Sequence, residues 1–239
     1  FGADTWQRVR RAGKHVGLSV HPFLLGAVLR SIQRWNQKRG KQTRILRVID
    51  NFTLRRFNQE PHVQDIYDVF AIPYSLDYQL DQDDKSLLKQ IKTKLDVLKK
   101  GAIRKELYRQ WLYMSSSLLS PKVLATRLLI KFVVRSNIIC TNIGPVPEDF
   151  DRFGDASVDE YYSFSQMFPP GEMMFLFSTY RGSLRTVLLY DTNKITQQEA
   201  QQFVDDTYTD ELLRLTEDGA QASLSVVDEG KEKSVEALS

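Results

Sequence analysis

The sequence holds one cysteine, three histidines and no long apolar run. The single cysteine, Cys140, excludes a disulfide framework, and its apolar neighbours indicate a packing role rather than a nucleophile. A chain without disulfides fits a reducing compartment, so we expect a cytoplasmic protein. No segment approaches the roughly 18 apolar residues of a membrane span, and no signal peptide opens the sequence. The start at Phe1, with no methionine, suggests a fragment of a longer protein.

The histidines stand apart from one another, and none has the spacing of a metal ligand. His15 lies near a predicted helix end, His21 lies at a predicted helix start, and His62 follows a proline in a polar loop. Capping or surface roles account for the first two. The chain also lacks a glycine-rich phosphate loop, a GxSxG elbow and a paired-carboxylate signature. These patterns therefore identify no catalytic base, and we predict no metal site.

The net charge of +3 is unevenly distributed along the chain. Residues 217–239 carry six acidic residues against two lysines, which leaves a net charge of +7 on residues 1–216. The C-terminal segment has little periodicity and few large apolar residues, so we predict a folded lobe over 1–216 and a flexible acidic tail over 217–239. The basic residues of 1–216 are dispersed and accompany no nucleic-acid-binding motif, so we expect no nucleic-acid partner.

Hydrophobic periodicity predicts an α/β fold, in which helices pack on a mixed, largely antiparallel sheet. The expected strands are 44–50, 67–78, 138–140, 156–165, 173–180 and 184–191. The expected helices start at Asp4, at His21-Pro22, at Asp81–Asp84, at Ser120-Pro121 and at the capping box Thr196–Glu199. The first two helices have a short joint, so we expect a hairpin. Pro73 in the second strand indicates a sheet edge or a bulge.

The stretch from Arg135 to Pro147 is the centre of this pattern. Residues 138–140 are apolar and mostly β-branched, which is typical of a strand buried on both faces. The following Thr141–Pro145 segment predicts a tight polar turn, because Gly144 permits positive φ and Pro145 fixes φ. A turn at the end of a buried strand is a common place for functional groups, although a structural turn alone also explains the pattern.

Three segments in order resemble the C-terminal half of the chloramphenicol-acetyltransferase-like superfamily. That superfamily includes the condensation domains of nonribosomal peptide synthetases, polyketide-associated acyltransferases and alcohol acyltransferases. The first segment is Ala12–Val20 with Leu24–Ala27, similar to a helix, a G-x-T-V turn and a helix of small residues. The second is Ile45–Arg55, ending VIDNFTLR, followed by a strand at Val69–Tyr74. The third is Cys140–Gly144, similar to an S-N-x-G turn.

The resemblance implies one lobe of a two-lobed enzyme whose active site is a tunnel between the lobes. Asn142, Gly144 and Thr141 would line the tunnel or the lobe interface, and Arg55 and Asp50 would support the site structurally. The donor would be a thioester of coenzyme A or of a phosphopantetheine carrier, with no covalently bound cofactor. Thr141 and Asp68 depart from the serine and glycine that are common in the family, which leaves the subfamily and the substrate open.

The family's catalytic motif, HHxxxDG, lies in the N-terminal lobe and does not occur in this sequence. Its second histidine is the general base that deprotonates the acceptor amine or hydroxyl. We therefore expect the C-terminal lobe of an acyltransferase or condensation enzyme, with an N-terminal lobe and an acyl carrier or coenzyme A as partners. The alternative is a non-catalytic docking or scaffold module that retains the fold.

Overall fold

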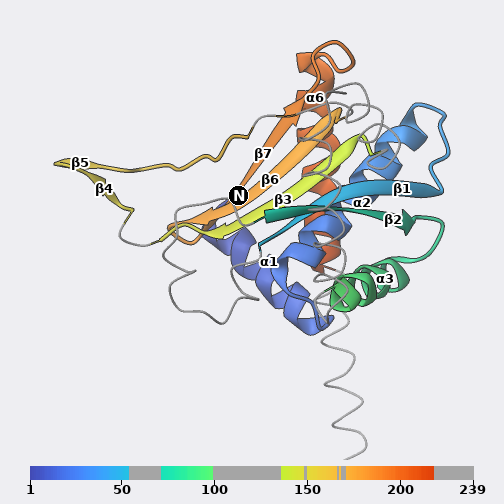
Figure 1. Cartoon of the computed structure of the whole chain (residues 1–239), viewed down its shortest axis with the longest axis horizontal. Helices are drawn as coiled ribbons and strands as arrows, with labels where there is room; N and C mark the ends of the chain where they lie inside the picture. The colour runs from blue at the N-terminus through green and yellow to red at the C-terminus, as the bar shows by residue number, and fades with distance from the viewer. Residues whose placement is uncertain (54–70, 99–135, 148–149, 166, 168–170, 218–239) are drawn as a thin grey trace, which may run out of the picture.

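A computed structural model of the chain describes residues 1–53, 71–98, 136–147, 150–165, 167 and 171–217 (Figure 1). Arg55, Asp68, the helix predicted from Ser120 and the tail beyond Glu217 lie outside these residues. The predicted boundary between the folded lobe and its tail therefore stays a prediction.

The core of the fold is a five-stranded sheet with the order β2-β1-β3-β6-β7. Its strands are β1 (Ile45–Thr53), β2 (Ala71–Gln79), β3 (Ile138–Pro145), β6 (Met173–Tyr180) and β7 (Ser183–Tyr190). The three central strands β1, β3 and β6 are parallel. The outer strand β2 pairs antiparallel with β1, and the outer strand β7 pairs antiparallel with β6; these are the two longest pairings of the sheet. The predicted mixed sheet is confirmed. Pro73 lies on the edge strand β2, as predicted, because a proline cannot donate to a second neighbour.

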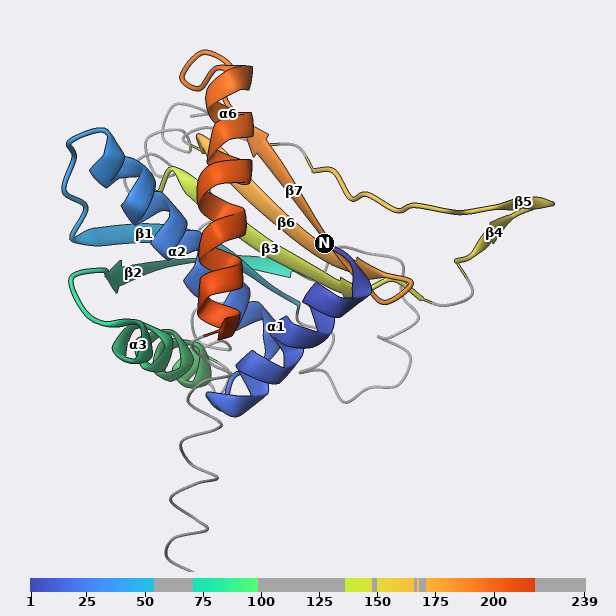
Figure 2. The same ribbon diagram turned by 180° about the vertical axis from the view of Figure 1, so that it is seen from behind.

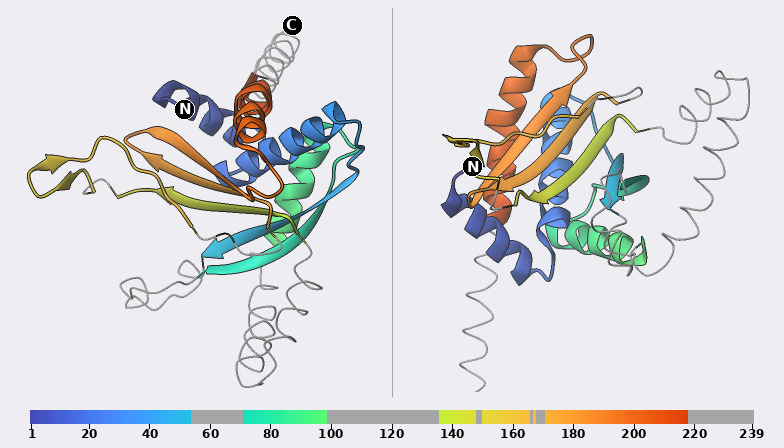
Figure 3. Two further views of the ribbon diagram at one scale, coloured as in Figure 1. Left: turned by 90° about the horizontal axis from the view of Figure 1, so that it is seen from above. Right: turned by 60° about the vertical axis from the view of Figure 1, so that its left-hand side comes forward.

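The helices cover one face of this sheet (Figure 2 and the left view of Figure 3). They are α1 (Ala3–His15), α2 (Val20–Lys38), α3 (Asp84–Val97) and α6 (Gln197–Phe203), which runs through a π-helical turn (Val204–Tyr208) into a last helical segment ending at 217. Large side chains between the two layers form the main core, among them Phe23, Leu24, Phe175, Phe177 and Tyr208. A smaller apolar cluster around Ile49, Ile139, Met174 and Leu176 lies on the opposite face.

The helix termini follow from local side chains. Asp83 caps α3 by accepting a hydrogen bond from the Ser86 N–H, and Thr196 and Glu199 form the predicted capping box of α6. The N-cap of α1 is Gly2 rather than Asp4, because the helix begins two residues earlier, with the Trp6 N–H donating to the Gly2 carbonyl. Asp4 instead lies in the first helical turn, where its negative charge interacts favourably with the helix dipole.

The predicted hairpin of α1 and α2 is wrong, because the two axes meet at 100°. The joint after α1 is tight: Gly17 has a φ of +68°, and the Leu18 N–H donates to the Gly13 carbonyl. The second helix therefore crosses the sheet at an angle to the first. Within the described ranges no single helix has the length and apolar composition to cross a membrane, and α1 and α2 pass that test only as a bent pair.

The central strand is longer than the sequence indicates. β3 does not stop at Cys140 but continues to Pro145, because β6 offers paired residues along its whole length. Asn142 faces Phe177 and Gly144 faces Ser178, so Ile143 is the extra residue of a β-bulge. The predicted positive φ at Gly144 is confirmed at +86°, and it shapes this bulge rather than a turn.

The segment 150–165 forms an arm that projects from the body beside the β6–β7 hairpin (Figure 1). The strand predicted over 156–165 is reduced to a two-residue pairing of β4 (Arg152–Phe153) with β5 (Ala156–Ser157). The base of the arm is fastened by the Tyr180 hydroxyl, which donates to the carbonyls of Phe150 and Val158. The arm carries four acidic residues against one arginine, and Phe153 and Phe164 are 85% and 74% exposed.

Candidate functional site

The carboxyl ends of the parallel strands β1, β3 and β6 lie at one edge of the sheet. In open α/β sheets, ligands bind outside this edge, because loops and helix N-termini converge there. Asp50 of β1 and Cys140 of β3 are paired across the ladder and point toward the helices, whereas Asn51 and Thr141 point to the opposite face. The edge therefore presents a different set of polar groups on each side of the sheet.

On the helix-free face, Asn51 joins the two strands by donating from Nδ2 to the Thr141 hydroxyl oxygen over 3.1 Å. Thr141 is half-buried, and its side chain holds the ends of β1 and β3 together. Of the residues that the sequence singled out, Thr141 thus has a demonstrated contact with the neighbouring strand. Its predicted position at a tunnel wall stays a prediction.

Asn142 lies at the bulge of β3, where its Oδ1 accepts a hydrogen bond of 2.9 Å from the Gly144 N–H. This bond satisfies a donor that the bulge would otherwise leave free, and it is the contact expected of a structural asparagine. Among the described residues it is the side chain's one hydrogen bond, so the Nδ2 amide group stays available. The structure gives Asn142 a role in shaping the edge and leaves its predicted role toward a ligand open.

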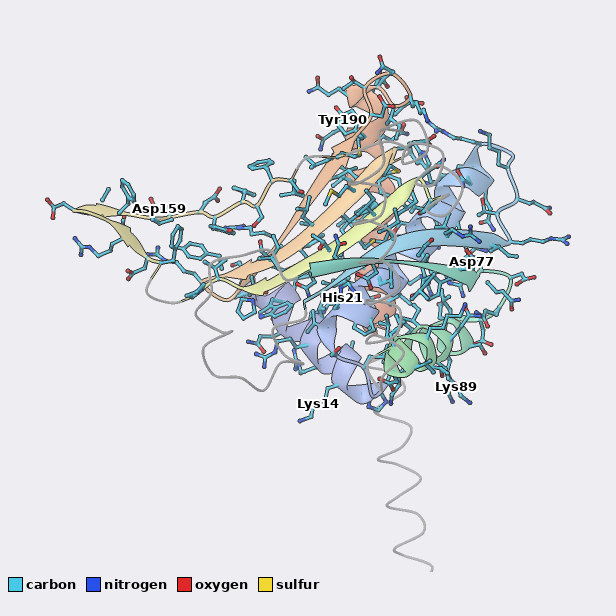
Figure 4. All side chains as sticks on the ribbon, in the orientation of Figure 1. Lys14, His21, Asp77, Lys89, Asp159 and Tyr190 are labelled. Atoms are coloured by element: carbon cyan, nitrogen blue, oxygen red, sulfur yellow. The ribbon has the colours of Figure 1, made fainter. Side chains whose placement is uncertain are left out.

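A buried histidine–aspartate pair occupies the helix-facing side of the same edge. His21 Nε2 lies 2.7 Å from Asp50 Oδ2, with 17% of the histidine and 1% of the aspartate side chain exposed. His21 is in the first turn of α2, whose N-cap Ser19 makes no side-chain hydrogen bond, so the pair joins a helix N-terminus to a strand end. Figure 4 labels His21 between the strands and the first two helices.

Two atoms of this pair have no hydrogen-bond partner in the part of the chain that the structure describes. They are His21 Nδ1 and Asp50 Oδ1, and both are buried. The hydroxyl of the neighbouring Tyr78 on β2 is buried without a partner as well. Buried polar atoms are usually hydrogen-bonded, and a cluster of exceptions calls for an explanation such as a function.

Electrostatics connect the pair to its neighbours. Burial raises the pKa of the Tyr78 hydroxyl, and the charge of Asp50 raises it further. Burial and then Asp50 likewise raise the pKa of the Cys140 thiol well above its ordinary value, so Cys140 stays protonated and serves as packing, as predicted from its apolar neighbours. No group of three or more metal-ligating side chains occurs among the described residues.

The structure thus brings four of the five singled-out residues to one edge of the sheet: Thr141, Asn142 and Gly144 on β3, and Asp50 on β1. Arg55 lies outside the described residues. Asp50 was expected to be structural support, and it does bind another element, through His21. The role of His21 was missed, because capping explained a histidine at a helix start. One feature of the sequence indicated a buried partner for Asp50. It lies two residues after Val48 on the same strand, so its side chain points to the same, buried face of the sheet.

The comparisons with known proteins assign the fold to a class. Among the solved structures that match are condensation and epimerization domains of peptide synthetases and a wax ester synthase, so the fold that the sequence-based resemblance implies is confirmed. No family model matches the sequence, and no curated protein matches it.

Three solved structures illustrate the match. The epimerization domain of tyrocidine synthetase B superposes with a TM-score of 0.67 at 18% identity, over 92% of this chain and 47% of that one. The first condensation domain of the CDA synthetase gives 0.58 at 12% identity, over 92% and 44%. The wax ester synthase/diacylglycerol acyltransferase of Marinobacter aquaeolei VT8 gives 0.55 at 13% identity, over 90% and 47%. The chain therefore spans less than half the length of these neighbours.

Proposed function

We propose that this chain is the C-terminal lobe of a two-lobed, thioester-dependent acyltransferase or condensation enzyme. It would work with an N-terminal lobe, in the same or another chain, that carries the HHxxxDG motif. The acyl donor would be a thioester of coenzyme A or of a carrier-bound phosphopantetheine, and the acceptor an amine or a hydroxyl. The single buried thiol is in keeping with a reducing, cytoplasmic setting.

The proposal rests on the lengths over which this chain and its structural neighbours superpose. The similarity covers about nine-tenths of this chain, but less than half of each of the three neighbours described above. Two of these neighbours are named for condensation or acyl transfer. A lobe that reproduces half of such a fold, with polar groups gathered at its sheet edge, is suited to form one wall of a shared site.

The projecting arm supports the existence of a partner. Its exposed aromatic side chains, Phe153 and Phe164, find no cover in the described part of this chain. Exposed apolar groups gathered on one projection are typical of protein–protein contacts. The acidic residues beside them, among them Asp155 and Asp159, would favour a partner surface with basic character.

The experiment compares the chain alone with the chain supplied with an N-terminal lobe that carries HHxxxDG. Acetyl-CoA serves as the donor, butylamine and 1-butanol serve as acceptors, and mass spectrometry detects the amide or ester. We expect no turnover from the chain alone, turnover with the lobe, and its loss when the second histidine of the motif is replaced. Turnover by the highly purified chain alone would contradict the two-lobed assignment.

A non-catalytic docking module is the second candidate, and the Asn142–Gly144 hydrogen bond favours it, because that contact needs no ligand. In the same experiment this candidate predicts a stable complex with the N-terminal lobe and no product. Analytical ultracentrifugation of the mixture measures the complex, so absence of binding and absence of chemistry are distinguished.

A further inference from the structure

The His21–Asp50 pair has hydrogen-bonding atoms to which the proposed function assigns no role. Asp50 is a carboxylate with one oxygen bonded to His21 and the other, Oδ1, buried without a partner. A buried ionised group usually accepts several hydrogen bonds, because it has lost those of water. This carboxylate has retained a free acceptor atom, and the histidine beside it has retained a free ring nitrogen, Nδ1.

These two atoms select for a particular kind of ligand group. A carboxylate oxygen only accepts hydrogen bonds, and it prefers a positively charged donor. A ring nitrogen accepts or donates according to its protonation. A thioester carbonyl has no hydrogen to offer Asp50 Oδ1, whereas an amine or a hydroxyl does. The pair is therefore suited to the acyl acceptor rather than to the acyl donor.

The only exposed part of the pair is on His21. Asp50 lies three residues before the end of β1 with 1% of its side chain exposed, whereas His21, in the first turn of α2, keeps 17% of its side chain exposed, so a ligand would reach Asp50 past the His21 ring. Asn142 belongs to the same edge and, two residues beyond Cys140 on β3, to the same helix-facing side. The described titratable groups whose pKa senses Asp50 are Tyr78 and Cys140, both neutral at pH 7 because burial and Asp50 raise their pKa.

We propose that His21 and Asp50 form the subsite that binds the amine or hydroxyl of the acyl acceptor, with Asp50 Oδ1 as the atom that accepts its hydrogen bond. The assignment of this group to an acyl acceptor rests on the proposed function, whereas the binding of a hydrogen-bond donor by Asp50 does not. Asp50 also holds the imidazole in place through Nε2, so that Nδ1 has one fixed direction.

The test uses the 239-residue chain with isotope-labelled histidine, because its three histidines give few signals. Butylamine and 1-butanol are titrated as probes. Trimethylbutylammonium, which has the charge but no N–H, and S-butyl thioacetate, which has only acceptor atoms, serve as controls. We expect saturable shifts of the His21 ring signals with butylamine, weaker ones with 1-butanol, and none with the two controls. Affinities in the millimolar range are expected for ligands of this size.

Two variants of the pair and one matched control accompany the titration. Asp50→Asn keeps the shape but removes the charged acceptor, and we expect the dissociation constant for butylamine to rise about tenfold or more. His21→Gln identifies the His21 signals and should weaken binding as well. His15→Gln alters an exposed histidine at the end of α1 and should change nothing. Circular dichroism verifies that each variant is folded.

The outcomes separate the two proposals. If butylamine leaves the His21 signals of the folded wild-type chain unchanged, or if it binds the Asp50→Asn chain equally well, the subsite is absent and the two-lobed assignment is unaffected. If the probes bind as expected but no lobe confers acyl transfer, the pair binds amines and hydroxyls without serving acyl transfer, and the proposed function fails. In an active two-lobed protein, His21→Gln should raise KM for the acceptor more than it lowers kcat.

Discussion

Two polar clusters lie against helix α2, and they differ in how completely their groups are paired. The ion cluster, made of Arg30, Asp84, Arg214, Glu211 and Arg34, joins α2 to the start of α3 and to the last helical segment. The His21–Asp50 pair joins the first turn of α2 to β1. Both are partly or fully buried, so both gave up hydration when the chain folded.

The charged groups of the ion cluster have many hydrogen-bond and ion-pair partners. Arg30 donates to Asp84 over 2.6 Å, to Gln33, and to the carbonyls of Leu80 and Gln82, so its planar group is enclosed by acceptors. Arg214 contacts Asp84 and Glu211 at 2.7–2.8 Å, and Glu211 also accepts from Arg34. A partly buried network of this kind, in which every charged group has an oppositely charged partner, rigidifies the packing of the helices. The cluster therefore has a structural explanation within the chain itself.

The His21–Asp50 pair has no such explanation. It has one short contact and two buried atoms without partners. For a similar burial cost, the fold receives fewer hydrogen bonds in return. Burial of a charged pair therefore does not by itself indicate a site. The unpaired atoms distinguish a candidate binding group from a structural one.

The largest stability effect is expected in the ion cluster. Asp84→Asn removes the carboxylate that pairs with both Arg30 and Arg214. We expect a loss of roughly 1–3 kcal/mol in the free energy of unfolding, discounted because Asp84 and Arg214 are partly exposed. Urea denaturation followed by circular dichroism measures this change. A loss smaller than that of Asp50→Asn would reverse the comparison of the two clusters.

Asn142 tests the same sheet edge through activity. In the two-lobed protein, Asn142→Ala should lower kcat/KM at least about tenfold, which is about 1.4 kcal/mol of transition-state stabilisation. Asn142→Asp is the matched control, because its Oδ1 still accepts from the Gly144 N–H while the amide Nδ2 is gone. If the aspartate variant keeps full activity and the alanine variant loses stability, Asn142 serves the bulge alone.

A smaller stability effect is expected at the pair itself. Asp50→Asn should change the free energy of unfolding by about 1 kcal/mol or less, since the amide oxygen can still accept from His21 and no uncompensated buried charge remains. The same urea experiment measures it beside Asp84→Asn. A loss on the order of 3 kcal/mol would show that the pair is mainly structural.

The pH dependence of stability should also separate the clusters. Burial acts to raise the pKa of Asp84, but Arg214 and Arg30 outweigh it and hold the pKa below its ordinary value. A group with a depressed folded-state pKa stabilises the fold above its unfolded-state pKa of about 3.9, and this stabilisation is lost as the pH falls through the folded value. Denaturation midpoints at several pH values below 5 should fall more steeply for the wild type than for Asp84→Asn. Equal slopes would assign the acid sensitivity to other carboxylates.

The smallest effect is expected from the acidic tail. Deleting residues 218–239 should leave the melting temperature nearly unchanged, because this segment is poor in large apolar residues. Glu217 is kept in this truncation, since it pairs with Arg8 of α1 over 3.2 Å. A drop of several degrees would show that the tail packs on the body, with Leu224, Val226 and Val227 as its apolar candidates.

Much of the fold could be predicted from local patterns. The strands of the β6–β7 hairpin, the caps of α3 and α6, and the edge position of Pro73 follow from residues close together in the sequence. The hairpin loop Arg181-Gly182 has positive φ at both residues, as a two-residue turn of type I′ requires. The angle between α1 and α2 could not be predicted in this way, because it depends on how α2 packs on the sheet.

Local sequence patterns were enough to predict the class of fold, the buried strand 138–140, the positive φ of Gly144 and the packing role of Cys140, because periodicity and residue type act over short distances. The continuation of β3 to Pro145 depends on tertiary structure, since pairing with β6 outweighs the local turn signal of Gly144 and Pro145. The contact of His21 with Asp50 depends on tertiary structure as well. These residues are 29 positions apart, and they meet because the first turn of α2 packs against β1.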